Sequence, residues 1–429
     1  MLDIKFIREN PDKVRTAAKN KNVDVDVDAL LALDAERKSL QAKIEEINRQ
    51  RNEASKAKDI ENGKRLKGEL GALEETMTAL DAKMQPLLLK LPNVPVDGTP
   101  VGPDESGNVV IRTWGEPTKF AFTPKDHVEL GKLHGMIDNE LGAEVTGARF
   151  TYLKGDLVLL QQAIISYVFS VLTDKGALEA IIAANGLSAP STPFVPVVPP
   201  LMIKPEVFQR MARLEPREER YHIPSDDLYL IGSAEHTLGP MHMDETLDEA
   251  ALPLRYVACT AAFRREAGSY GKDTKGILRL HQFDKIEMES FSAGEQSLAE
   301  QDLFVALQEH FLQALRIPYQ VVQICTGDMG GPDARQIDIE SWMPGQQRYR
   351  ETHTSDLMTD YQARRLGTRV KRRAGGSEFA HTNDATAIAL GRTLIALIEN
   401  HQREDGSIGV PEALVPFMAG RTVIGTPRC

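Results

Sequence analysis

Two short segments of this chain carry residue types that suit the binding of a nucleotide and an amino acid. Arg264 and Glu266 follow the apolar run YVACTAAF, and the run HQFDKIE comes after a polar, Gly-rich loop. In that second run Phe283, Lys285 and Glu287 stand at alternate positions, and the side chains of a strand alternate between its faces. The sequence therefore predicts a β-hairpin with one face that offers a guanidinium for phosphate, a ring for a flat base and a carboxylate for an ammonium group. For an isolated hairpin, a salt-bridged surface is the alternative interpretation.

The rest of the chain decides between these interpretations. The segment FRREAGS…HQFDKIE resembles motif 2 of the class II aminoacyl-tRNA synthetases, in the form typical of the seryl-tRNA synthetase family. The opening MLDIKFIRENPDKVR, SAE at 233–235, DIESW…YRETHT…DYQARR at 338–365 and GRTLIALIENHQREDGSI at 391–408 resemble the same family in the same order. The resemblance covers essentially the whole chain, in the form typical of bacteria.

A further segment, PFVPVVPPLMI at 193–203, resembles motif 1 of the same class, with Pro199 as its signature proline. In class II enzymes this motif lies in the dimer interface, so the resemblance implies a homodimer. Without the family context, a Pro-rich turn before a strand explains the segment equally well.

Length and composition are those of an ordinary globular protein, and 429 residues predict two or three domains. Cys259, Cys325 and Cys429 are far apart and form no CxxC pair, so we expect no zinc site and a reducing, cytoplasmic location. The charged, amphipathic N-terminus is unlike a signal peptide. The longest apolar stretch, LVLLQQAIISYVFSVL, is interrupted by Gln161 and Gln162 and is too short to span a bilayer.

The net charge of −11 argues against a protein that coats nucleic acid, so DNA is not an expected partner. A local basic patch is still sufficient for RNA phosphate contacts. The distribution of charge along the chain therefore matters more than its sum.

Residues 28–88 read as two long helices with heptad spacing, which predicts an antiparallel coiled-coil hairpin. Each helix would reach on the order of 40 Å at 1.5 Å per residue. The apolar seam consists of Leu30, Leu33, Leu40, Ile44, Ile47 and Ala54 on the first helix and Leu66, Leu70, Leu73, Met77, Leu80, Met84 and Leu87 on the second.

The predicted tip of this hairpin has a local positive excess in an acidic protein. From the sequence alone, a solvated coiled-coil surface explains it. The resemblance implies instead an arm that contacts tRNA phosphates and grips the long variable arm of tRNA(Ser), which requires no base-specific readout. The candidate tRNA-binding residues are Arg49, Arg51, Lys56, Lys58, Lys64, Arg65 and Lys67.

Residues 91–117 are dense in Pro and Gly and predict a boundary between a tRNA-binding domain, 1–100, and a catalytic domain, 101–429. Strands interspersed with helices predict an α+β body with a mostly antiparallel sheet and flanking helices. No GxGxxG or Walker sequence is present, which argues against a Rossmann or P-loop nucleotide site. The predicted strands are 228–232, 255–263, 276–290, 318–324 and 336–342, and the predicted helices of this body are 126–140, 157–185, 297–315 and 388–401.

The resemblance also implies roles in ATP binding. Serine activation brings a carboxylate to the α-phosphate of ATP, which requires cations and metal more than a general base. Arg264 is implied to bridge the α-phosphate and the serine carboxylate, a task for a planar bidentate donor, and Arg392 to contact the γ-phosphate. Phe283 would stack on the adenine and Glu266 would accept from its exocyclic amine. The full predicted ATP-binding set is Arg264, Arg265, Glu266, Phe283, Glu351, Thr352, His353, Thr354 and Arg392, with Arg264 and Arg392 as the catalytic residues.

Glu351 and Thr354 resemble the Mg²⁺-binding pair of the family, and a carboxylate with phosphate oxygens is the usual ligand set for Mg²⁺. His353 lies between them in sequence. We assign it no role as a base because the reaction requires none.

The predicted serine-binding set departs from the family at three positions. Ser233 replaces a usual Thr, Asp384 a usual Asn and Thr386 a usual Ser. We expect the methyl lost at 233 and the methyl gained at 386 to offset each other, so that serine remains the substrate. The sequence offers no account of Asp384. The complete predicted set is Ser233, Ala234, Glu235, Arg264, Glu287, Asp384 and Thr386, with Glu287 for the ammonium and Glu235 for the hydroxyl or amine.

The resemblance as a whole implies an ATP-dependent, AMP-forming serine–tRNA ligase that forms seryl-adenylate and then esterifies tRNA(Ser), with tRNA(Sec) as a further candidate acceptor. One alternative is a synthetase-like paralogue that activates serine or a related hydroxy amino acid for another acceptor. A regular heptad arm argues against it, because a paralogue freed from tRNA needs no such arm. A coiled-coil interaction protein with a decayed catalytic body is a third interpretation, and the presence of Arg264, Glu266, Glu287, Glu351 and Arg392 argues against it.

Overall fold

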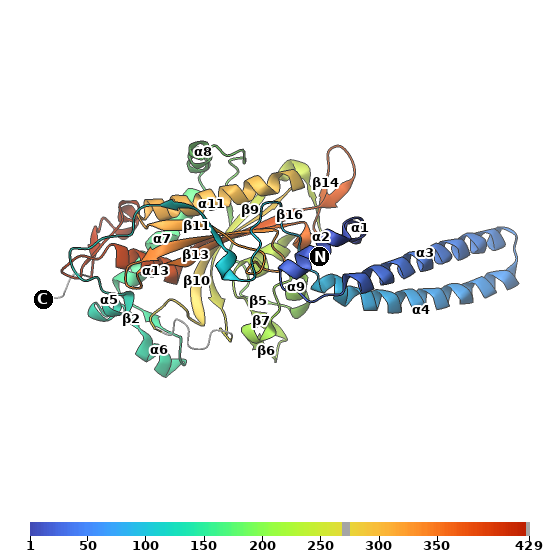
Figure 1. Cartoon of the computed structure of the whole chain (residues 1–429), viewed down its shortest axis with the longest axis horizontal. Coiled ribbons are helices and arrows are strands. Elements are labelled where there is room, and N and C mark those ends of the chain that lie inside the picture. The colour runs from blue at the N-terminus through green and yellow to red at the C-terminus, as the bar shows by residue number, and fades with distance from the viewer. Residues whose placement is uncertain (268–274, 426–429) are drawn as a thin grey trace.

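Two long antiparallel helices form an arm that projects from the rest of the protein in the computed structural model (Figure 1). They are α3 (Val27–Lys56) and α4 (Ile60–Lys90), and the structure describes residues 1–267 and 275–425 of the chain. The predicted coiled-coil hairpin is therefore confirmed, with each helix end slightly beyond its predicted limit. The seam residues buried between the helices are Leu30, Leu40, Ala54, Leu66, Leu70, Leu80 and Met84.

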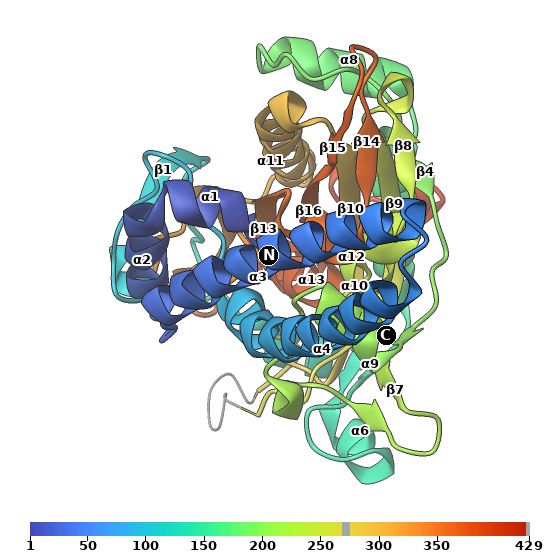
Figure 2. The same ribbon diagram turned by 90° about the vertical axis from the view of Figure 1, so that its right-hand side faces the viewer.

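Two short helices pack at the base of the arm (Figure 2). In α1 (Ile4–Glu9) and α2 (Pro11–Asn20), the side chains of Ile7 and Val14 are fully buried. They belong to one apolar cluster with the base of the arm and with Tyr361 of the body. The N-terminal segment is thus packed against both the arm and the body.

Lys21, directly after α2, connects this N-terminal segment to a loop of the body. Its ammonium donates hydrogen bonds to the backbone carbonyls of Gly330 and Asp333, at 2.9 and 2.5 Å. Burial lowers the pKa of Lys21 to about 8, although the nearby carboxylates of Asp333 and Asp356 oppose the shift. A buried cation therefore fixes the N-terminal segment to the body.

An eight-stranded sheet forms the centre of the body, and Figure 2 shows several of its strands side by side. Neighbouring strands are antiparallel except for one parallel pair at an edge, so the predicted α+β fold with a mostly antiparallel sheet is confirmed. In spatial order the strands are β1 (Val109–Trp114), β11 (Tyr319–Gln323), β12 (Arg335–Met343), β13 (Arg348–Thr359), β16 (His381–Ala389), β10 (Gln282–Ser292), β9 (Leu254–Phe263) and β4 (Val195–Pro196).

The helices of the body lie around this sheet, and several of them share its apolar core. They include α5 (His127–Leu133), α6 (Asn139–Val145), α7 (Asp156–Leu172), α8 (Lys175–Ala184), α9 (Pro205–Arg210), α10 (Glu235–Leu238), α11 (Ser297–Ala314), α12 (Tyr361–Leu366) and α13 (Leu390–Asn400). Smaller sheets are formed by β2 (Ile137–Asp138) with β3 (Tyr152–Leu153), by β5 (Met202–Ile203), β7 (Leu228–Leu230) and β6 (His222–Ile223), by β15 (Ser377–Phe379), β14 (Arg369–Lys371) and β8 (Thr246–Asp248), and by β17 (Ile408–Gly409) with β18 (Val423–Ile424).

Several predicted element limits were wrong. The helix predicted over 126–140 ends at Leu133 and is followed by the short strand β2, because Gly135 has a φ of +60°, in the left-handed region that ends helices. The helix predicted over 157–185 breaks at Asp174, which caps α8, and the strand predicted over 276–290 begins only at Gln282. Strands β13 and β16 were not predicted, because both bury polar side chains and so lack the apolar runs from which the other strands were predicted. The predicted loop residues 268–274 lie outside the described residues.

Within residues 1–267 and 275–425, no single helix has the length and apolar character needed to cross a membrane. Only α7 and α8 together pass that test, and they are bent by 80° relative to each other.

Our first prediction concerns the buried ion pair between Arg255 of β9 and Glu300 of α11, whose side chains are both 0% exposed. The guanidinium donates to both carboxylate oxygens, at 2.8 and 2.6 Å. Arg255→Met would leave a buried, unpaired carboxylate, so we expect it to lower the free energy of unfolding by about 3–5 kcal/mol. Urea denaturation at pH 7 measures this change.

The matched control is Arg316→Met, because Arg316 and Glu412 form an ion pair that is 70% and 90% exposed. We expect this variant to unfold like the unmodified protein. Equal destabilisation by the two substitutions would contradict the prediction.

Candidate active site

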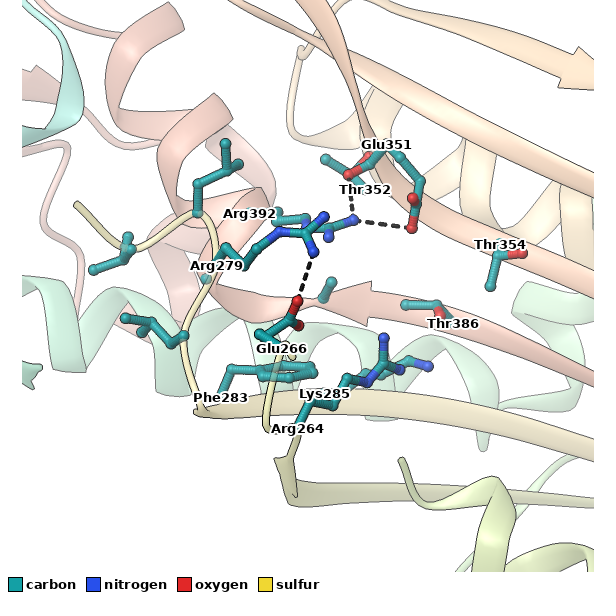
Figure 3. Close-up of a pocket in the computed structure, with 15 residues that line it drawn as sticks. Arg264, Glu266, Arg279, Phe283, Lys285, Glu351, Thr352, Thr354, Thr386 and Arg392 are labelled. Carbon is teal, nitrogen blue, oxygen red and sulfur yellow. Dashed lines mark hydrogen bonds and ion pairs between the residues drawn. The ribbon is translucent and has the colours of Figure 1, made fainter. Parts of the chain in front are cut away.

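A pocket of about 110 Å³ opens where the β9–β10 hairpin, β13, β16 and the start of α13 meet (Figure 3). It adjoins a second, more open pocket of about 490 Å³ that extends toward Glu235 and His236. The two pockets share the side chains of Arg264, Glu266, Arg279, Glu351 and Arg392.

Arg264 lies between the two parts of this site. Its Nε donates a hydrogen bond to the carbonyl of Gly232 at 3.1 Å, and its guanidinium lies 5.4 Å from the centre of the Phe283 ring. Glu266, two residues further on, accepts a hydrogen bond from Arg279 at 2.5 Å. The hairpin therefore presents a cation, an aromatic ring and a carboxylate to the same pocket. The carboxylate that the sequence predicts beside Phe283 and Lys285 is that of Glu287, which is buried next to Lys285.

Arg392 and Glu351 face each other across the pocket. The Arg392 Nη1 donates to the Glu351 side chain and to its backbone carbonyl, both at 2.9 Å. Arg392 reaches this position because it lies in the first turn of α13, directly after β16. Figure 3 shows both side chains above the hairpin, with Thr352 and Thr354 on the adjacent strand.

A one-residue β-bulge on β13 decides which side chains line the site. Glu340 pairs with Glu351 and Ile339 with His353, so Thr352 is the extra residue. Three positions separate Glu351 from Thr354, which would put them on opposite faces of a regular strand. The bulge places them on the same face.

Asp338 of β12 lies directly opposite Thr354 on the same face. Burial raises the pKa of the Asp338 carboxyl well above its usual range, and the negative charge of Glu351 adds to the effect. Two carboxylates and a hydroxyl are hard oxygen donors, the kind that Mg²⁺ prefers. Asp338, Glu351 and Thr354 thus fit a magnesium site beside the pocket.

The second part of the site is a buried cluster around Ser233. Its hydroxyl lies 2.9 Å from Glu235 Oε2 and 3.2 Å from Glu287 Oε2. The Lys285 ammonium lies 2.7 Å from Glu287 and donates to the Ser233 hydroxyl at 3.0 Å. The cluster therefore already holds an ammonium group, that of Lys285, among carboxylate and hydroxyl oxygens.

The pKa values of the two glutamates in this cluster are shifted in opposite directions. Burial raises the pKa of Glu287 to about 8, although the Lys285 ammonium opposes the shift. Burial acts in the same direction on Glu235, but Lys285 and Arg213 outweigh it and hold the pKa of that carboxyl below its usual range. Glu235 is thus a permanent carboxylate, whereas Glu287 titrates near neutral pH.

Asp384 and Thr386 of β16 complete this part of the site. Asp384 pairs with Glu289 and Thr386 with Glu287 in the sheet register. Ala387 is an extra residue on β16, a second bulge. Oxygen atoms of Glu235, Glu287 and Asp384 lie within 4.8 Å of one another.

Comparison with known proteins identifies the family. A model of the tRNA synthetase class II core domain (G, H, P, S and T) matches residues 219–401, and a model of the seryl-tRNA synthetase N-terminal domain matches residues 1–95. The serine–tRNA ligase of Symbiobacterium thermophilum is 41% identical over 97% of this chain and 98% of its own, and that of Rubrobacter xylanophilus is 39% identical over the full length of both chains.

The chain belongs to the seryl-tRNA synthetase family. It is therefore an aminoacyl-tRNA ligase. Among solved structures, the seryl-tRNA synthetase of Pyrococcus horikoshii, complexed with ATP, has a TM-score of 0.88 and 35% identity and covers 100% of both chains. The cytoplasmic serine–tRNA ligase of Naegleria fowleri, in complex with AMP, has a TM-score of 0.87 at 29% identity.

Most predicted site residues of this synthetase lie together around the two adjoining pockets. Six of them line neither pocket: Ser233, Glu287 and Asp384, which belong to the buried cluster described above, and Arg265, Ala234 and His353. The Arg265 guanidinium lies 5.5 Å from the ring centre of Tyr221, and Ala234 is buried in a small apolar cluster. His353 lies on the other face of β13, where burial lowers the pKa of its imidazole to about 3.

The predicted tRNA-binding residues lie in the arm, remote from both pockets (Figure 1). Lys56, Lys58 and Lys64 are exposed near the turn between α3 and α4. Arg49 and Arg65 are also exposed, and each forms an ion pair with a glutamate of its own helix.

Sequence reasoning missed three side chains of the site. Asp338 begins the quoted segment at 338–365 and Arg279 lies just before HQFDKIE, but no periodicity distinguishes either from other polar residues. Arg213 lies in a segment with no motif, and its role depends on contacts with residues far away in the sequence. The two bulges have no sequence signal that an apolar-pattern analysis detects.

Our second prediction concerns the pH dependence of stability. The pKa of Glu287 rises from its ordinary 4.5 to about 8 in the folded protein. Between these values the native state holds a proton that the unfolded chain loses, so stability falls as pH rises toward 8. The slope from one such group is at most about 1.4 kcal/mol per pH unit. We expect Glu287→Gln to remove this contribution in urea denaturation series from pH 5.5 to 8.5.

Glu144→Gln is the control for this series, because Glu144 is exposed on α6. It should leave the pH profile unchanged. If Glu287→Gln and Glu144→Gln gave the same profile as the unmodified synthetase, Glu287 would not titrate in this range.

Proposed function

We propose that this synthetase activates L-serine with ATP to seryl-adenylate, releases pyrophosphate and transfers serine to the 3′ end of tRNA(Ser). One observation carries the proposal. The Arg264 guanidinium lies between a pocket lined by Phe283, Glu351 and Arg392 and a buried cluster of hydroxyl and carboxylate oxygens at Ser233. A residue at that junction is positioned to contact the α-phosphate and the amino-acid carboxylate together.

In the nucleotide part, Phe283 provides a flat face for adenine and Glu266 an acceptor for its exocyclic amine. Binding of the base requires the Arg264 guanidinium, 5.4 Å from the Phe283 ring centre, to turn toward the phosphates. Arg392 would exchange its hydrogen bonds with Glu351 for contacts with the γ-phosphate. This exchange frees the Glu351 carboxylate at the moment when ATP arrives.

Mg²⁺ would be held by Glu351 and Thr354, with Asp338 beside them. When bound, the metal neutralises phosphate charge. The role of the protein there is to orient oxygen donors, and the bulge at Thr352 accomplishes this by turning Glu351 onto the face of Thr354.

In the amino-acid part, Glu287 and Glu235 would receive the serine ammonium. The Lys285 ammonium lies in this space, 2.7 Å from Glu287 and 3.8 Å from Glu235. Serine binding therefore requires Lys285 to move away, and the neighbouring carboxylate and phosphate oxygens of the substrates offer it new acceptors. Ser233 and Thr386 supply hydroxyl groups to the same cluster.

We further propose that residues 1–100 form the tRNA-binding domain and residues 101–429 the catalytic domain. The exposed basic side chains near the tip of the arm suit tRNA phosphates, whether in tRNA(Ser) or tRNA(Sec). An intact arm gives no support to the paralogue with a different acceptor. Translation in the cytoplasm is the setting that this activity implies.

A homodimer through the motif 1 segment is part of the proposal. This segment, 193–203, borders the sheet edge at β4 and exposes apolar side chains that a monomer would leave in water. The exposed fractions are 54% for Val195, 97% for Val198, 40% for Leu201 and 45% for Met202.

ATP–pyrophosphate exchange with serine, threonine, alanine and cysteine tests the activation step. We expect strong exchange with serine alone. Glu287→Gln should raise the KM for serine at least about tenfold, because the substrate ammonium favours the ionised form of Glu287 and the amide cannot supply it, while the KM for ATP stays near its original value. Glu144→Gln is the matched control. Exchange with another amino acid, or with none, would contradict the proposal.

The same assay tests whether the methyl lost at Ser233 and the methyl gained at Thr386 compensate for each other. Thr386→Ser and Ser233→Thr each restore the residue usual in the family. We expect Thr386→Ser to change serine activation by less than about tenfold. A larger gain, with no effect of Ser233→Thr, would contradict compensation between the two positions.

The arm is tested by reversing three charges at its tip, Lys56→Glu, Lys58→Glu and Lys64→Glu together. Loss of phosphate contacts should lower kcat/KM for tRNA serylation at least about tenfold and reduce its salt dependence. Exchange without tRNA should not change, because the tip is remote from the pocket (Figure 1). Lys175→Glu, on the exposed start of α8, is the control. Unchanged serylation by the triple variant would contradict a role of the tip.

A further inference from the structure

A single guanidinium lies in the wall of the second pocket, among four carboxyl groups. Arg213 follows α9 at a distance of a few residues, and its side chain is 16% exposed. Its Nη2 lies 3.2 Å from Asp384, 3.5 Å from Asp356 and 3.5 Å from Asp333, and its Nε lies 3.7 Å from Glu235.

Arg213 gives a physical account of Asp384, the residue that stands where the family usually has Asn. The Asp384 side chain is 1% exposed, and a buried carboxylate is several kcal/mol unfavourable unless a cation pairs with it. Burial raises the pKa of Asp384 to about 7, while Arg213 and Lys285 oppose the shift. The Arg213 guanidinium thus favours the charged form of a carboxyl that burial would otherwise keep neutral.

The same guanidinium also restrains Glu235, from the side opposite Ser233. One oxygen of Glu235 accepts from the Ser233 hydroxyl at 2.9 Å, and the other faces Arg213 at 3.7 Å. Rotation of the Glu235 carboxylate would break both interactions. Arg213 therefore restricts the orientation of the Glu235 and Asp384 carboxylates, and with it the direction of their unused lone pairs.

The resulting arrangement suits an ammonium group. Oxygens of Glu235, Glu287 and Asp384 lie within 4.8 Å of one another. A nitrogen at the centre of a triangle with that edge would be about 2.8 Å from each corner, an ordinary N–H···O distance. An ammonium has three N–H donors and no acceptor, so three oxygen acceptors satisfy it fully.

We propose that Arg213 is a positioning residue for amino-acid recognition, which holds Glu235 and Asp384 so that Asp384 becomes the third acceptor for the substrate ammonium, next to Glu235 and Glu287. The inference rests on the proposed function, in which this cluster binds serine. A guanidinium has no acceptor to offer the substrate ammonium. Arg213 acts through the two carboxylates.

The test compares Arg213→Met, Asp384→Asn and the double variant by ATP–pyrophosphate exchange, with separate KM values for serine and ATP. We expect Arg213→Met to raise the KM for serine at least about thirtyfold and the KM for ATP less than about threefold, because the stranded carboxylates lie in the amino-acid part. Asp384→Asn alone should raise the KM for serine about tenfold through loss of one charged acceptor.

The double variant separates positioning from a merely structural role. Asn at 384 needs no cation, so Arg213→Met with Asp384→Asn should have a lower KM for serine than Arg213→Met alone, although Glu235 still lacks the cation. A general loss of structure would instead raise both KM values, and Asp384→Asn would not reverse it. If the effects of the two substitutions on the KM for serine are additive in the double variant, the inference is wrong.

Two further variants complete the design. Arg217→Met is the matched control, because Arg217 lies in the same segment and pairs with the exposed Glu215. Arg213→Lys keeps one charge without the fork geometry, and we expect an intermediate KM for serine. If Arg213→Met did not fold, Arg213→Lys alone and combined with Asp384→Asn would provide the same comparison.

The outcomes for the two proposals differ. No serine-dependent exchange by the unmodified synthetase would overturn the proposed function. Normal exchange by the unmodified synthetase, with the KM for serine of Arg213→Met within twofold of it, would overturn the role of Arg213 alone.

Discussion

The pairing register of β10, β16 and β13 is the constraint on which the rest of the site depends. Antiparallel partners directly opposite each other share a face, so Glu289, Asp384 and Asp356 form one row and Glu287 and Thr386 another. A slip of one residue would turn every one of these side chains to the apolar side. The bulges at Thr352 and Ala387 add one residue to β13 and one to β16. They reset the alternation at the points where each strand enters the pocket.

This register brings more carboxyl groups together than the local cations can neutralise. Glu289 is fully buried, and burial together with Asp384 raises the pKa of its carboxyl well above the usual range. Asp356 is shifted in the same direction, also mainly by burial. Apolar side chains at these positions would make the sheet more stable, so the buried acids reduce its stability.

The sequence predicts the parts of this molecule that depend on local pattern. The heptads at Leu66, Leu70 and Leu80 predict the arm, and alternation in HQFDKIE predicts the shared face of Phe283 and Lys285. The strands of the site are harder to predict from the sequence. Both β13 and β16 bury polar side chains, so neither shows a continuous apolar run. The family resemblance supplied their residues, not their geometry.

What the sequence could not supply depends on long-range contacts. Asp384 had no explanation until its neighbour was known, and that neighbour, Arg213, is 171 positions away in the chain. Propensity and periodicity describe windows of a few turns, so they do not register a pair of this separation. The same limit applies to the 2.7 Å contact of Lys285 with Glu287, whose chemical meaning depends on Ser233 from another element.

Lys21 restricts how the N-terminal segment and the body of this protein can be exchanged with those of other proteins, in evolution or by engineering. Its ammonium is held by carbonyls of the loop that also carries Asp333, a neighbour of Arg213. A chimaera that takes its first twenty-odd residues from another protein would place a different side chain in this loop of the body. The outer turns of the arm project away from the body (Figure 1), so their length and sequence can change without disturbing this contact. The exchangeable unit is thus the distal coiled coil, not the whole N-terminal region.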